Sequence, residues 1–125
     1  MTKPLDDITV IEIDNWMAAP SAGAILADLG AKVIKIEPLS GDPMRDMGRP
    51  AKIEGDIKDY DFQFDVDNRG KQSILLDLTN DDALKIVKKL CAKSEIFMCN
   101  LLAKRQEKFG LDPVSLSKVN PRIVH

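Results

Sequence analysis

Short apolar runs alternate along the chain with segments in which apolar residues recur every three or four positions. The runs predict strands, because strands inside a parallel sheet are apolar on both faces; they lie at residues 8–13, 33–36, 73–78 and 96–99. The periodic segments predict helices with one apolar face, at residues 20–29 and 83–91 and, more briefly, at 106–109 and 113–119. Ile123 and Val124 read as the beginning of a further strand.

Turn-forming and capping residues mark the ends of these segments. Gly30 and Gly110 stand where a helix would end in a left-handed residue, and Pro20 suits a first helical turn. The run Thr79-Asn80-Asp81-Asp82 resembles a capping box. Residues 38–70 contain prolines and glycines and few apolar residues, which predicts a long loop.

Strand, helix and strand joined by short connections form a βαβ unit, and repetition of that order predicts an α/β fold. We expect a Rossmann-like, mostly parallel sheet with helices on both faces, incomplete at the C-terminus. The 125 residues suit a single domain, and no linker divides them.

Composition narrows the classes of partner and location. A net charge of −2 provides no general attraction for nucleic acid or an acidic membrane, so neither is expected as a partner. The start lacks a secretory signal, and no apolar run reaches the length of a membrane span. Cys91 and Cys99 form no metal-ligand pattern, so we expect a cytoplasmic protein with reduced thiols and no metal site.

The carboxyl ends of parallel strands lie along one edge of a sheet, where α/β proteins bind small molecules. The residues after the predicted strands therefore form a candidate nucleotide site, with helix N-termini directed at an anion. Arg45, Arg49, Arg69 and Lys71 are candidate phosphate contacts. The alternative interpretation is a set of caps and turns with solvated charges, and the pattern alone slightly favours it.

Two other kinds of site are not expected. Glu37 ends a strand where a ribose-binding acid would stand, but the first loop has no Gly-x-Gly-x-x-Gly turn, so NAD binding is not expected. No catalytic group is evident either, since Asp14, Asp28 and Asp77 have no recognisable partner and His125 is the last residue. The lysines at 85, 88 and 89, with Lys104 and Arg105, read as a solvated face.

A set of short motifs, in order and spread over essentially the whole chain, resembles the class III CoA-transferases, the family of formyl-CoA transferase, carnitine CoA-transferase and α-methylacyl-CoA racemase. No single motif is decisive, but the set is specific. The motifs are Pro4-Leu5, Ala19-Pro20, residues 26–31, 33–38, 41–45 and 68–73, Leu76-Asp77-Leu78 and Asn120-Pro121-Arg122.

The resemblance implies that residues 1–125 form the N-terminal CoA-binding, Rossmann-like part of a larger enzyme that is an interlocked homodimer. Its substrates would be a CoA thioester and a carboxylic acid, with CoA as substrate and no tightly bound cofactor. In that family an aspartate attacks the acyl-CoA, giving an anhydride and then a thioester. That aspartate would lie beyond this chain, so we assign no catalytic residue within it and expect the chain alone to be inactive.

The same resemblance assigns CoA contacts to positions in this sequence. Met17 and Ala18 would line the adenine pocket, and the turn after the third strand would follow the nucleotide. The full set is Met17, Ala18, Pro38, Leu76, Asp77, Leu78, Thr79, Asn100, Leu101, Leu102 and Lys108.

The sequence departs from the family pattern at several of these positions. Pro38 and Lys108 stand where the family often has arginine, and a lysine keeps the charge but loses the bidentate geometry. The run Cys99 to Lys104 replaces the family's Glu-Asn-Phe-x-Pro-Gly. A racemase of the same family, or a non-catalytic CoA-binding or dimerisation module, is the alternative interpretation.

Overall fold

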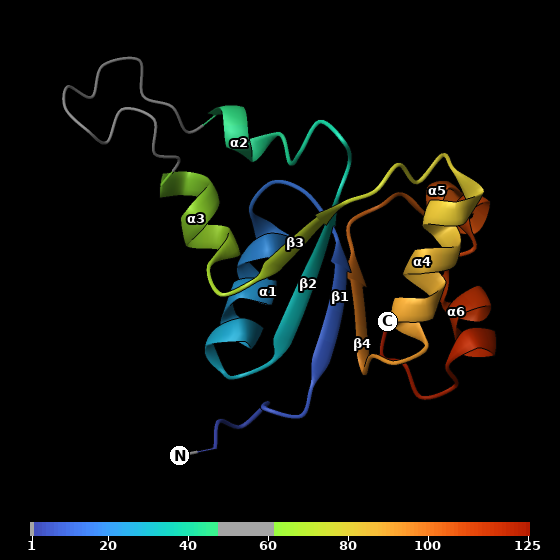
Figure 1. The fold of residues 1–125 in the computed structure, drawn as a ribbon, viewed down its shortest axis with the longest axis horizontal. Helices are drawn as coiled ribbons and strands as arrows, with labels where there is room; N and C mark the ends of the chain where they lie inside the picture. The colour runs from blue at the N-terminus through green and yellow to red at the C-terminus, as the bar shows by residue number, and fades with distance from the viewer. Residues whose placement is uncertain (1, 48–61) are drawn as a thin grey trace.

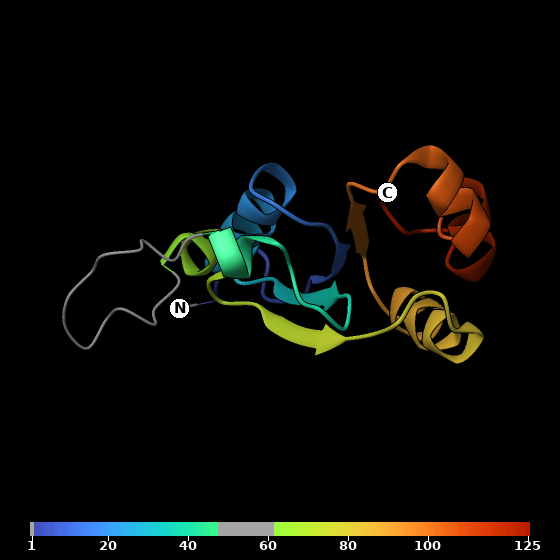
Figure 2. The same ribbon diagram turned by 90° about the horizontal axis from the view of Figure 1, so that it is seen from above.

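The fold is a three-layer arrangement of a parallel sheet between two groups of helices (Figures 1 and 2). The computed structural model describes residues 2–47 and 62–125. Within those residues four strands form one sheet in the order β3-β2-β1-β4, and every neighbouring pair is parallel. The strands are β1 (Thr9–Ile13), β2 (Lys32–Glu37), β3 (Gln72–Leu75) and β4 (Ile96–Cys99). The expected α/β architecture is confirmed, and the sheet is wholly parallel.

Six helices accompany the strands within the described residues. Figure 2 shows α1 (Ala18–Asp28), α2 (Met44–Met47) and α3 (Phe62–Asn68) on one side of the sheet. The other side carries α4 (Asp81–Cys91), α5 (Ala103–Phe109) and α6 (Pro113–Val119). None of the helices in residues 2–47 and 62–125 is long and apolar enough to cross a membrane.

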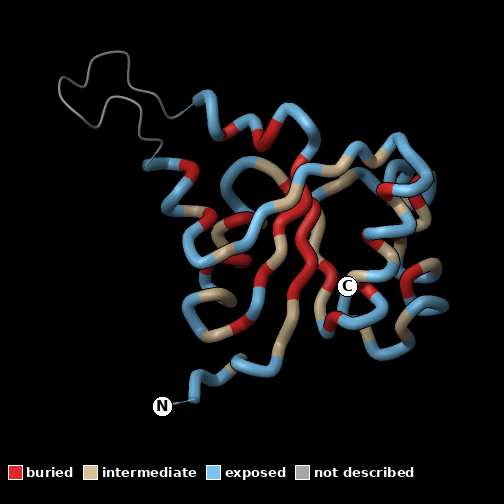
Figure 3. Tube along the Cα trace, viewed as in Figure 1, coloured by how far each residue is buried: buried red, intermediate tan, exposed pale blue. Residues whose placement is uncertain are grey.

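The two faces of the sheet differ in chemistry because side chains alternate along a strand. On the side of α4 to α6 the core is entirely apolar, with Ile11, Ile13 and Ile36 packed against Val87 and other residues of these helices. On the side of α1 an apolar cluster of Val10, Ala31 and Val33 lies near the amino ends of the strands. Figure 3 shows the buried residues concentrated in the central strands.

Most of the predicted ends are confirmed. Gly110, directly after α5, has a φ angle of 62°, and Gly30, which follows the C-cap Leu29 of α1, has a φ angle of 109°. Asn80, rather than Thr79, caps α4, with its side chain accepting a hydrogen bond from the amide of Asp82. Val124 makes a parallel bridge to Ile96, so the predicted further strand begins beside β4.

Two predicted segments are corrected. β3 ends at Leu75 rather than at residue 78. The Leu76 amide donates one more bond to the Glu37 carbonyl, after which the chain that follows β2 turns away from β3, with the Pro38 carbonyl accepting from the Gly41 amide at 2.8 Å. The predicted loop over residues 38–70 contains α2 and α3, which anchor themselves through buried Met44 and Phe64.

Candidate functional site

The carboxyl ends of β1 and β4 lie side by side where the strand order reverses. From β1 the chain proceeds to β2 on one side, whereas β4 pairs with β1 on the other. Open α/β sheets bind ligands at such a switch point, because the loops leave in opposite directions and open a crevice between them. The loops after β1 and β4 therefore border the candidate site.

An open hollow of about 490 Å³ lies there, which we name the α5 hollow. The loop after β1 contributes Asn15 and Trp16, and the β4 exit contributes residues 100–102. Helix α5 adds three cations, Lys104, Arg105 and Lys108, and no carboxylate among the described residues forms an ion pair with any of them. The hollow thus combines a positive wall with the indole of Trp16.

A second hollow of about 330 Å³, named the β2 hollow, adjoins the first and shares Asn15, Leu101 and Arg105 with it. Its remaining lining comes from the ends of β1 and β2, from the turn after β3 and from α5, and it is mainly apolar: Ile13, Ile36, Pro38, Leu39, Ser40, Leu76, Asp77, Leu78, Thr79 and Phe109. Together the two hollows suit an elongated ligand with an uncharged part and an anionic part.

The structure brings together most of the residues predicted as CoA contacts. Pro38 and the four residues of the turn after β3 line the β2 hollow, Asn100, Leu102 and Lys108 line the α5 hollow, and Leu101 lines both. Met17 and Ala18 line neither: Met17 caps α1 and is half-exposed, and Ala18 is the first residue of that helix. Their assignment to a nucleotide pocket remains a prediction.

Sequence reasoning missed some of the lining residues. Lys104 and Arg105 were assigned to a solvated face, but they stand with Lys108 on the hollow. Their spacing of three to four residues, which places them on one side of a helix, was the available signal. Asn15 and Trp16 gave no such signal, because their place depends on how the loop after β1 is held.

Local hydrogen bonds fix the turn and the loop around the hollows. Asp77 Oδ1 accepts from the amide of Thr79 at 2.9 Å and from its hydroxyl at 2.7 Å, which lowers the pKa of Asp77. Asn100 uses both ends of its amide on the backbone of Asn15: its Nδ2 donates to the carbonyl at 2.8 Å and its Oδ1 accepts from the amide at 3.3 Å. The loop after β1 is therefore tied to the exit of β4.

The cations proposed as phosphate contacts are paired with carboxylates instead. Arg45 forms a bidentate pair with Glu37, at 2.7 and 2.8 Å. Arg69 pairs with Asp28, and Lys71 with Glu12. None of these three cations lines either hollow, so the hollows give their predicted role no support, and Arg49 lies outside the described residues.

The fold provides Asp14 and Asp28 with partners that could not be recognised in the sequence. Asp28 pairs with Arg69, and Asp14 Oδ1 accepts from the Lys35 ammonium at 2.9 Å. Asp77 has Thr79 as described above. The partners are 21 to 41 residues away for the first two, a separation at which no local pattern reveals a pair.

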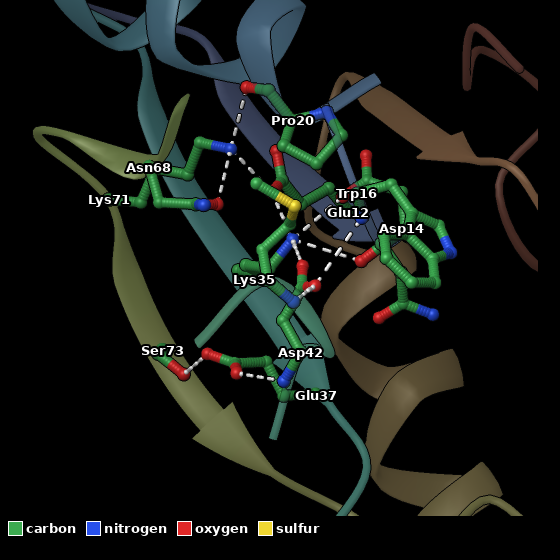
Figure 4. Close-up of polar contacts among 12 residues, drawn as sticks. Glu12, Asp14, Trp16, Pro20, Lys35, Glu37, Asp42, Asn68, Lys71 and Ser73 are labelled. Atoms are coloured by element: carbon green, nitrogen blue, oxygen red, sulfur yellow. Dashed lines mark hydrogen bonds and ion pairs between the residues drawn. The ribbon is translucent and has the colours of Figure 1, made fainter. Parts of the chain in front are cut away.

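A buried polar cluster, the Lys35 cluster, lies between the sheet and α1 and consists of Glu12, Asp14, Lys35, Asp42 and Lys71 (Figure 4). The Lys35 ammonium is 3.3 Å from Glu12 Oε1, 2.9 Å from Asp14 Oδ1 and 3.1 Å from Asp42 Oδ2, and its side chain is 1 % exposed. Lys71 donates to Glu12 Oε1 at 2.6 Å. Three carboxylates thus share two ammonium groups.

Burial and the neighbouring charges shift the pKa values of the residues in this cluster. Burial, and then the Asp14 carboxylate, raise the pKa of Glu12 to about 7, against the opposing effect of the two lysines. Burial lowers the pKa of Lys71. Burial also acts to lower the pKa of Lys35, but the carboxylates of Asp14, Glu12 and Asp42 outweigh it and raise that pKa.

Glu37, at the end of β2, is occupied by the protein itself. Besides Arg45, the Ser73 hydroxyl and the Asp42 amide donate to its carboxylate, which is fully buried. Burial alone would raise the pKa of Glu37, but these donors lower it to about 2. A carboxylate with its acceptor positions filled in this way has none left for a ribose.

The chain resembles CoA-transferases in both sequence and structure. The model of CoA-transferase family III matches residues 5–125. Cinnamoyl-CoA:phenyllactate CoA-transferase of Clostridium sporogenes is 36% identical over 98% of this chain, and succinate–glutarate CoA-transferase of Agrobacterium fabrum is equally similar over the same share. This chain covers 30% and 31% of those two proteins.

Solved structures agree with this result. A CAIB/BAIF family protein from Brucella suis superposes with a TM-score of 0.88 at 35% identity, over 99% of this chain and 32% of that one. Rv3272 from Mycobacterium tuberculosis gives a TM-score of 0.89 at 32% identity, over 98% of this chain and 33% of that one. The chain spans about a third of the length of these proteins, and it belongs to CoA-transferase family III.

Proposed function

We propose that this chain forms the CoA-binding part of a CoA-transferase that moves CoA between a CoA thioester and a carboxylic acid. The observation that carries the proposal is the pair of adjoining hollows at the strand ends, one apolar and one lined by three cations of α5. CoA has the same division, with several phosphate charges next to an uncharged base and a long uncharged arm.

The relatives support transfer between two acids. The proteins from Clostridium sporogenes and Agrobacterium fabrum are named as transferases that act on cinnamoyl-CoA with phenyllactate and on succinate with glutarate. These names favour a transferase over a racemase for this chain as well. The resemblance to the family further leads us to propose an interlocked homodimer in the cytoplasm, with the reacting aspartate supplied from outside these 125 residues.

Within this proposal Lys104, Arg105 and Lys108 bind the phosphates. Lys108 provides one charge on the wall of the α5 hollow, in the last turn of α5. Because its ammonium has no carboxylate partner among the described residues, a bound phosphate would replace only water around it. Hydrogen bonds to charged groups contribute about 1.5–3 kcal/mol, so one such contact affects affinity roughly tenfold or more.

Calorimetric titration with CoA tests the proposal. We expect the protein to bind CoA, and Lys108→Met to weaken binding about tenfold. Lys118→Met is the matched control, because Lys118 is also an exposed lysine in the last turn of a seven-residue helix but lines neither hollow. A folded protein that does not bind CoA, or equal losses in the two variants, would overturn it.

A further inference from the structure

The loop after β1 holds Trp16 in an unusual backbone conformation. Its φ angle of 72° is the only positive φ at a residue other than glycine in the described part of the chain. A bulky side chain rarely adopts this region, and it persists only where neighbouring contacts hold the backbone there. Trp16 is also half-exposed and lines the α5 hollow, so the contacts that hold its backbone also determine part of the hollow's shape.

Side chains from two other strand exits provide those contacts. The Lys35 ammonium donates to the carbonyl of Asp14 at 2.9 Å. The carboxylate of Asp42, in the loop after β2, accepts from the amide of Trp16 at 3.3 Å and from the amide of Met44 at 3.0 Å. Asn100 holds the residue between them, Asn15. Three consecutive residues are therefore each held from another part of the sheet.

One ammonium connects the two loops. Lys35 contacts a carboxylate of each loop, Asp14 Oδ1 after β1 and Asp42 Oδ2 after β2, and both carboxylates are fully buried (Figure 4). Lys35 itself lines neither hollow. Buried charges of this kind have few alternative partners, so the contacts specify one arrangement of the loops. Without the ammonium the two carboxylates would repel each other.

We propose that Lys35 and Asp42 are positioning residues, which tie the loop after β1 to the loop after β2 and thereby set the place of Asn15 and Trp16 on the wall of the α5 hollow. Neither residue needs to touch the ligand to affect its affinity. The part of this inference that concerns affinity rests on the proposed binding of CoA, whereas the part that concerns the loop does not.

Asp42→Ala removes the tie and leaves the remaining charges of the Lys35 cluster balanced. It leaves two lysines and two carboxylates in the Lys35 cluster, and it removes the acceptor of the Trp16 amide. Asp42→Asn is the milder variant, because its Oδ1 still accepts from both amides while the ion pair to Lys35 is lost. Glu12→Gln, compared above pH 7 where Glu12 is ionised, is the matched control: it also neutralises a buried partner of Lys35, but one that lies on β1 and holds neither the loop after β1 nor the loop after β2.

Trp16 reports on the loop directly, because it is the only tryptophan of the chain. In the ligand-free protein we expect Asp42→Ala to at least double the quenching of Trp16 by acrylamide and to speed its anisotropy decay. We expect the same variant to weaken CoA binding about tenfold, Asp42→Asn to shift both readouts in the same direction by less, and Glu12→Gln to leave both within twofold of the wild type. Circular dichroism checks that each variant is folded, and Asp42→Asn decides the question if Asp42→Ala does not fold.

Two outcomes overturn the proposal: wild-type quenching and affinity in the folded Asp42 variants, or equal changes in Glu12→Gln, which would trace the effect to the charge of the cluster. If the wild-type protein does not bind CoA, the proposed function fails by itself. The quenching of Trp16 still decides the positioning role in that case.

Discussion

Glu12 makes the stability of this fold depend on pH around neutrality. Its carboxylate shares the two ammonium groups of the Lys35 cluster with Asp14 and Asp42, and burial with the Asp14 charge raises its pKa to about 7 from an ordinary value of 4.5. With Glu12 protonated, two ammonium groups face two carboxylates. Ionisation of Glu12 adds a third negative charge that has no matching positive one.

The direction of this pH dependence follows from the number of protons that the folded and the unfolded protein bind. Between pH 4.5 and 7 the folded protein keeps the Glu12 proton, whereas the unfolded chain has lost it. Folding therefore binds a proton in this range, and the free energy of unfolding falls as the pH rises through it. Each unit of pKa difference corresponds to about 1.4 kcal/mol, so the difference of 7 from 4.5 gives a fall of about 3 kcal/mol.

Urea unfolding at a series of pH values between 4.5 and 8.5 measures this effect in the wild type and in Glu12→Gln. Glutamine cannot ionise, so the variant should lack the fall, and its stability relative to the wild type should increase by about 3 kcal/mol from the lowest to the highest pH. Glu107→Gln, at an exposed glutamate of α5, should leave the pH profile of the wild type unchanged. A stability difference between wild type and Glu12→Gln that is constant with pH, or that changes in the opposite direction, would refute the reasoning.

Two further variants test a second buried carboxylate and the packing of α1 against the Lys35 cluster. Glu37, whose pKa is lowered to about 2, stabilises the fold above pH 4.5 and loses this contribution as the pH falls from 4.5 towards 2. Between pH 4.5 and 2 the free energy of unfolding of Glu37→Gln should therefore fall by about 3 kcal/mol less than that of the wild type. An acid titration by circular dichroism in which the variant shows the wild-type pH dependence would contradict this. Gly23→Ala in α1 should destabilise the protein by about 1–3 kcal/mol, because the new Cβ would lie 2.0 Å from Glu12 Oε2 and 3.0 Å from Lys71 Nζ. Since alanine normally stabilises a helix relative to glycine by about 1 kcal/mol, thermal unfolding that shows a gain would mean that the Lys35 cluster yields to the methyl group.

Much of the fold was open to prediction because its signals are local. Apolar runs, helical spacing and capping residues act over a few positions, and they placed β1, β2, β4, α1, α4 and α6 close to their observed ends. β3 ends three residues earlier than predicted, and α5 begins three residues earlier. Their order implied a parallel sheet, and the parallel sheet implied a site at the carboxyl ends of its strands. The same logic placed Pro38 and Asn100 at that edge, whereas Lys108 was assigned only through the family resemblance; all three line hollows there.

The partners of the charged residues could not be predicted from the sequence. Glu12 and Lys35 lie within apolar runs, 23 residues apart, and only the register of β1 with β2 places them together. Lys71 lies in a loop, 59 residues from Glu12. For that reason Arg45, Arg69 and Lys71 read as free cations although the fold pairs each with a carboxylate.

The sequence by itself determined the type and order of the elements, the edge of the sheet at which a ligand site is expected, and the membership of a CoA-transferase family. Only the tertiary structure decided which polar residues are occupied by the fold and which remain for a ligand. The physical reason is that helix and strand formation depend on neighbours along the chain, whereas a buried charge depends on whatever side chain the packing places within about 3 Å of it. In this protein that packing turns Lys35 and Asp42 into a tie between two loops and leaves the cations of α5 facing the hollow.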